Sequence, residues 1–256
     1  MMARVDGEMP FLDHLEELRW RLLWVVLTYV VAVFAAFVIL AKIDVLVWLQ
    51  APIHDLLKGK KLVYTHPGDP FQIVLNFSLA LGLIFSLPMI VWQGWGFLAP
   101  ALHRNERRVV VPVFVGALAL FLAGAAMAYF FVLPFSLNFL LNFQSDAFDP
   151  MITASEYFGF VISMVLGFGA AFELPIVILA LSALGIVTPQ FLGRYRRHAA
   201  VGCVIAGSVL TPGDLIYASA MMAGPLYLLY EVSIWLSYLV QRRKKEPEAI
   251  GNEAAA

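Results

Sequence analysis

Charge and cysteine are both scarce in this sequence. Only 14% of its 256 residues are charged, whereas about 25% is usual in a globular domain. The single cysteine, Cys203, lies in an apolar stretch, which excludes a disulfide framework or a thiolate metal site. A formal net charge of -1 disfavours nucleic-acid binding, because that activity needs a strongly basic face.

Catalytic and phosphate-binding patterns are missing as well. None of the five histidines belongs to a His-Glu-x-x-His motif, and no Ser/His or paired-aspartate arrangement is expected at a common membrane depth. The sequence has no glycine-rich phosphate loop either. These absences disfavour an ATPase, a zinc protease and an intramembrane protease, so we expect no catalytic residue, no cofactor and no metal.

Apolar residues, by contrast, make up 61% of the chain, and they fall in long runs. A spanning helix needs about 20 mostly apolar residues, and four runs meet that length. Two shorter helical runs flank the turn Thr211–Asp214, and together they predict a helical hairpin. The sequence therefore predicts an all-α polytopic membrane protein in which the fifth and sixth of six spans are short. The expected spans are approximately 22–42, 71–95, 109–133, 157–183, 198–211 and 215–240.

The arginines predict the orientation of these spans, because basic residues are retained in short cytoplasmic loops. Every arginine lies before the first span, after the sixth, or in the loops that follow the second and fourth. The opposite side carries basic residues only in its first loop. Both termini are therefore expected on the cytoplasmic side. The basic residues of the opposite side are Lys42, Lys58, Lys60 and Lys61.

The segments between and beyond the spans have patterns of their own. The two long outer loops, 43–70 and 135–156, contain helical periodicity and are expected to form a cap. Residues 1–241 form one membrane domain, and the charged, alanine-rich tail 242–256 is expected to be disordered. The acidic N-terminal segment lacks the order of a signal peptide, so the first span is expected to stay in the mature protein.

The segment 9–21 precedes the first span and has apolar residues at helical spacing. This pattern predicts an amphipathic helix lying on the cytoplasmic membrane face. The structural interpretation is an interfacial anchor with a pair of residues four apart, Glu17 and Arg21. In the functional interpretation the same charged residues belong to a binding site. The periodicity is consistent with both interpretations.

Glu106 and Glu173 are carboxylates in unusual settings. Glu106 stands among three arginines of the first cytoplasmic loop, as their ion-pair partner or as a binding group for a cation. Glu173 lies deep in the fourth span, where an ionised, unpaired carboxylate is costly and a functional role is the default. Pro175 should bend the helix beside it and open a groove.

Asp214 lies in the turn between the two short helices. It can cap the sixth helix at its N-terminus, which is ordinary turn chemistry. Glu231, near the end of that helix, is expected to have a structural role.

These residues together resemble the TatC family, the multispanning receptor subunit of the twin-arginine protein translocase. The resemblance covers nearly the whole chain and depends on the order and spacing of its motifs. They are His14–Arg19, Ala51-Pro52, Phe97–Leu102, Glu106–Arg108, Phe168-Gly169, Phe172–Pro175 and Leu210–Asp214.

The resemblance implies export of folded proteins that carry an Arg-Arg signal peptide, driven by the proton-motive force in a prokaryotic cytoplasmic membrane. It implies TatA- and TatB-type single-span subunits as partners, together with self-association. Glu17 and Glu106 would pair with the twin arginines, and Arg19 and Phe97 would shape the same patch. Glu173 and Asp214 would contact partner helices.

One position departs from the family pattern. Glu16 stands where the family usually has an apolar or variable residue, so two adjacent carboxylates compete for the role given to Glu17. They point about 100° apart on a helix, so only one can face a given partner. The alternatives to a translocase subunit are a proton-coupled transporter of a small solute, which predicts an internal repeat that we do not find, and an intramembrane enzyme.

Overall fold

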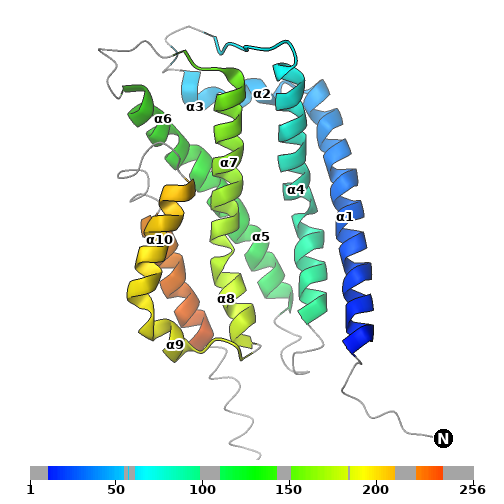
Figure 1. Cartoon of the computed structure of the whole chain (residues 1–256), viewed down its shortest axis with the longest axis vertical. Coiled ribbons are helices and arrows are strands. Elements are labelled where there is room, and N and C mark those ends of the chain that lie inside the picture. The colour runs from blue at the N-terminus through cyan, green and yellow to red at the C-terminus, as the bar shows by residue number, and fades with distance from the viewer. Residues whose placement is uncertain are drawn as a thin grey trace, which may run out of the picture.

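The structure is a computed structural model, and it describes residues 11–54, 57, 61–98, 110–142, 151–183, 185–210 and 223–238. Long helices stand side by side in it (Figure 1). Four helices of the described part are long and apolar enough to cross a membrane, which agrees with the four long runs of the sequence. They are Leu15–Lys42, Asp69–Phe97, Val113–Asn142 and Ala154–Ser182.

The first span is the C-terminal part of one uninterrupted helix. The sequence predicts a surface helix at 9–21 and a separate span from residue 22, but the structure has no break between them: α1 runs Phe11–Lys42. Neither proline nor glycine occurs within these 32 residues, so nothing interrupts the backbone hydrogen bonds. At 1.5 Å per residue α1 is about 48 Å long, against a hydrocarbon core of ~30 Å. Its charged N-terminal turns therefore extend beyond the core.

Helix α1 packs mainly on α4, Asp69–Leu98. The two backbones come close at Gly82, where an added Cβ would lie 2.8 Å from the Cα of Val33. A glycine at the crossing therefore sets the distance between the helices, as small residues do in membrane proteins. The outer face of α1 is open, with Phe34 71% exposed, as suits a lipid-facing surface.

The third span is also longer than the sequence predicts. Helix α5, Val110–Met127, continues through a π-helical turn, η3 (Ala128–Val132), into α6, Leu133–Asn142. The sequence places a span end at 133 and a separate cap helix from 135. Pro134 has no N–H, and its ring crowds the carbonyl four residues earlier. The wide turn directly before it accommodates the ring without ending the helix.

The fourth span is broken where the sequence predicts a bend. Helix α7, Ala154–Phe172, ends at Glu173, and α8, Leu174–Ala183, follows immediately. The Glu173 N–H bonds to the Ala170 carbonyl at 3.1 Å, a tighter turn than an α-helix has. Pro175 supplies no N–H to continue the helix.

The helical cap predicted for the loop between the first and second spans is present. It contains α2, Val45–Trp48, and α3, Ala51–His54. Tyrosine hydroxyls fasten it to the bundle: Tyr157 donates to the Leu49 carbonyl at 2.6 Å, and Tyr129 donates to the Trp48 carbonyl at 3.1 Å.

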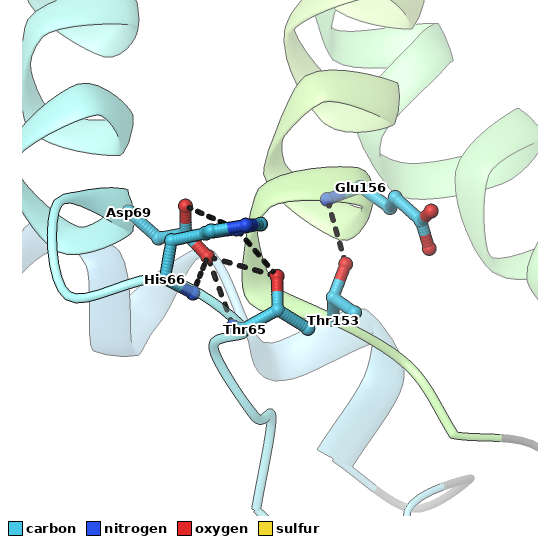
Figure 2. A network of polar contacts seen from close by, with 5 residues as sticks. All are labelled: Thr65, His66, Asp69, Thr153 and Glu156. Atoms are coloured by element: carbon cyan, nitrogen blue, oxygen red, sulfur yellow. Dashed lines mark hydrogen bonds and ion pairs between the residues drawn. The ribbon is translucent and has the colours of Figure 1, made fainter.

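The N-termini of α4 and α7 lie at the same end of the bundle as this cap (Figure 1). Figure 2 shows the Asp69 carboxylate accepting from the backbone N–H groups of Thr65 and His66, each at 3.0 Å. Thr153 caps α7 by accepting from the Glu156 N–H at 3.3 Å. A backbone bridge joins Val63 to Thr153, so the loop between the first and second spans is tied to the start of the fourth span.

Further helices form the remaining flank, and the sequence predicts helices at two of these three places. They are α9, Pro189–Arg194, α10, Arg196–Leu210, and a helix over 223–238. Tyr230 donates to the Leu192 carbonyl at 2.9 Å, and Glu231 pairs with Arg196 at 2.9 Å. Glu231 therefore has a structural contact. The 15 residues of α10 measure about 22 Å, less than the ~30 Å core.

Replacing Gly82 with alanine should separate α1 from α4. The added Cβ meets the Val33 backbone, which cannot rotate away, so we expect a loss of roughly 1–3 kcal/mol and a lower apparent melting temperature in detergent. Gly94→Ala is the matched control on the same helix, because no atom lies within 4 Å of its added Cβ. Equal melting temperatures for the two variants would contradict this packing.

Candidate functional site

The first candidate site lies where α1 begins and α4 ends, at the same end of the bundle (Figure 1). Glu17 lies on the α1 side and is half-buried. Its Oε1 accepts from Arg21 Nε at 2.9 Å and also from the Arg21 Nη2. The other terminal nitrogen of Arg21, Nη1, donates to Gln93 Oε1 of α4 at 3.1 Å. One guanidinium therefore joins the two helices.

The structure distinguishes the two adjacent carboxylates. Glu17 is turned toward α4 and holds the guanidinium, whereas Glu16 is exposed. This agrees with the angle expected between consecutive helix positions. The ion pair of Glu17 and Arg21, which the structural interpretation of this segment predicts, is present.

The other predicted residues of this patch differ in placement. Phe97 lies on α4 one turn beyond Gln93, and is half-buried. Arg19 is on α1 but exposed. Glu106 falls outside the described residues, so its distance from Glu17 stays a prediction.

Sequence reasoning missed two residues of this site, Gln93 and Gly96. Gln93 could have been noticed as a lone amide near the end of an apolar helix. Gly96, three residues later, lies against the Arg21 guanidinium: an added Cβ would be 3.0 Å from Arg21 Cζ and would overlap Nη1. Together they provide the hydrogen-bond acceptor and the space that the arginine uses.

The second candidate site is the break between α7 and α8. Glu173 is half-buried, and within the described part of the chain its buried Oε1 has no hydrogen-bond partner. Pro175, which causes the break, is among the fully buried residues. A carboxylate oxygen at membrane depth without a partner is costly. The site therefore favours contact with water or with a polar group from another molecule.

Asp214 belongs to the segment 211–222, which lies outside the described residues. The helices on either side of it are described. The hairpin stays a prediction, and the choice between a capping and a docking role for Asp214 stays open.

Known proteins resemble this chain along most of its length. Residues 13–225 match the model of the family described as TatC, Sec-independent protein translocase protein. The TatC protein of Aquifex aeolicus (strain VF5) is 37% identical over 240 residues, which cover 93% of this chain and 98% of that protein. The TatC protein of Escherichia coli (strain K12) is 35% identical over 245 residues, 94% of each chain.

Solved structures agree with the sequence matches. A crystal structure described as the twin arginine translocase receptor TatC superimposes with a TM-score of 0.76 at 37% sequence identity, and the match covers 89% of this chain and 99% of that one. A second structure of the same receptor, in the detergent DDM, also gives 0.76 at 38% identity.

The agreement of sequence and structure over this length confirms the predicted helical membrane fold and gives the small-solute transporter no support. This chain belongs to the TatC family of Sec-independent protein translocase proteins.

Proposed function

We propose that this chain is the receptor of a twin-arginine translocase in a bacterial cytoplasmic membrane. It binds Arg-Arg signal peptides at the end that carries Glu17, Arg19, Phe97 and Glu106, and this end faces the cytoplasm together with both termini. With TatA- and TatB-type subunits, and through self-association, it exports folded precursor proteins using the proton-motive force. The receptor itself catalyses no reaction.

The observation that carries this proposal is the guanidinium bound to Glu17. One carboxylate oxygen accepts from two nitrogens of the same arginine, so the site already has the geometry that an arginine ligand needs. A planar guanidinium donates in a fork that a lysine ammonium cannot reproduce. Two signal arginines need two such acceptors, and Glu106 is the proposed second one.

Glu173 and Asp214 are proposed to serve partner helices rather than the signal. The Oε1 of Glu173, which has no hydrogen-bond partner among the described residues, can accept a hydrogen bond from a polar group on a single-span subunit. The shortness of α10 supports a thinned membrane or shelter by neighbouring helices on this flank. Signal recognition therefore uses residues from the first half of the sequence, and partner assembly uses residues from the second half.

Removing both proposed acceptors, in the double variant Glu17→Gln and Glu106→Gln, should abolish cross-linking of an Arg-Arg signal peptide to this protein. Each amide lacks the negative charge that holds a guanidinium. Glu16→Gln is the matched control, since that neighbouring carboxylate is exposed, and it should bind the peptide normally. Undiminished capture by the double variant would place the binding site elsewhere.

Replacing Glu173 with alanine should leave signal capture largely intact and impair export or partner assembly. The measurement is export of an Arg-Arg reporter in cells that lack the native subunit, together with co-purification of TatA- and TatB-type subunits. Glu156→Gln alters an exposed carboxylate at the other end of α7 and should export normally. Normal export by the Glu173 variant would mean that the buried acid is merely tolerated.

A further inference from the structure

We propose that Arg21 is an internal competitor for the signal peptide: its guanidinium occupies Glu17 in the resting receptor and leaves when a signal arginine arrives. This inference rests on the proposed function. It adds a specificity-determining element that lies within the receptor itself.

The contacts of Arg21 are those of a ligand in a site. Its Nε and Nη2 donate to Glu17 Oε1, and its Nη1 donates to Gln93 Oε1 at 3.1 Å. An ordinary ion pair between residues four apart on one helix involves that helix alone. Here a second helix contributes the acceptor, the side-chain amide of Gln93. Two guanidinium nitrogens therefore donate to α1 and the third donates to α4.

The space around the guanidinium is also specific. Gly96 of α4 lies directly against it, and a Cβ there would be 3.0 Å from Arg21 Cζ and 3.3 Å from Nη2. Any residue other than glycine would push the guanidinium away. The end of α4 therefore supplies a hydrogen-bond acceptor and a recess that hold Arg21 in place, whereas the incoming arginine needs only the Glu17 carboxylate.

The pair can open at low cost. The side chains of Arg21 and Glu17 are each 25% exposed, so water and an incoming peptide can reach them. Partly exposed ion pairs contribute little net stability, because the charges are well solvated when apart. A signal arginine offers the same chemistry, so it can exchange with Arg21 at Glu17, and the released Arg21 becomes hydrated.

Competition of this kind has a defined signature. If only the open fraction of the receptor binds, the apparent affinity for any ligand of that site falls by the same factor. Opening the pair should therefore tighten the binding of every peptide equally. The ratio between Arg-Arg and Lys-Lys peptides should not change, because that ratio comes from Glu17 and its partner acceptor.

The test uses the full chain in lipid nanodiscs and a fluorescent peptide that carries Arg-Arg in a signal sequence, with a Lys-Lys peptide for comparison. Arg21→Gln removes the competitor. Gly96→Ala displaces it without any change in charge. We expect both variants to bind the Arg-Arg peptide roughly two- to fivefold more tightly than the wild type, the size expected for one partly exposed ion pair.

Two controls separate geometry from charge and folding. Arg197→Gln removes an exposed positive charge at the same end of the bundle (Figure 1) and should leave the affinity unchanged. Circular dichroism and melting temperature report whether each variant is folded. Because Gly96→Ala moves only the far end of a flexible side chain, it should keep the wild-type melting temperature.

Unchanged or weaker binding in folded Arg21→Gln and Gly96→Ala would overturn the competitor role and make Arg21 a structural or direct binding residue. An increase in Arg21→Gln alone would show a charge effect, which also contradicts the proposal. A wild-type receptor that fails to distinguish Arg-Arg from Lys-Lys peptides would instead overturn the proposed function. The two failures are therefore distinguishable.

Discussion

A hydrocarbon environment offers no hydrogen bonds, so the backbone N–H and C=O groups of a spanning segment must find partners within the protein. The long helices satisfy this requirement by themselves. Where proline prevents it, the chain responds in two ways. At Pro134 a π-helical turn keeps one helix running, whereas at Pro175 the helix ends and restarts. Only the second response leaves a carboxylate, Glu173, at the break.

The same constraint explains why polar chemistry gathers at the ends of the helices. At the end of the bundle that carries α2 and α3, side-chain oxygens of Asp69 and Thr153 accept from backbone N–H groups of Thr65, His66 and Glu156 beside the starts of α4 and α7. At the opposite end, Arg21 is held by Glu17 and Gln93. The first set of contacts satisfies the starts of two helices, while the second set joins α1 to α4.

Much of this arrangement is readable from the sequence, because apolar runs and proline positions report local requirements. The four long spans, the cap helices and the break beside Glu173 follow from such signals. Other features depend on tertiary contacts. The periodicity of residues 11–22 is helical whether the segment lies on the membrane surface or continues into the first span. The pattern therefore could not show that these residues form the start of α1. Gln93 meets Arg21 across 72 positions of sequence, a pairing that no local pattern contains.

Because α1 packs mainly on α4 in the described part of the chain, it can tilt about the point where the two helices cross. Its pivot is the crossing of Val33 and Gly82, and Glu17 lies sixteen residues away, about 24 Å along the helix axis. A tilt of about 5° at that pivot moves Glu17 by roughly 2 Å over such an arm, enough to separate Arg21 from Gln93. The thickness and lateral pressure of the bilayer, which act on the tilt of a helix, therefore also act on the contact between Arg21 and Gln93.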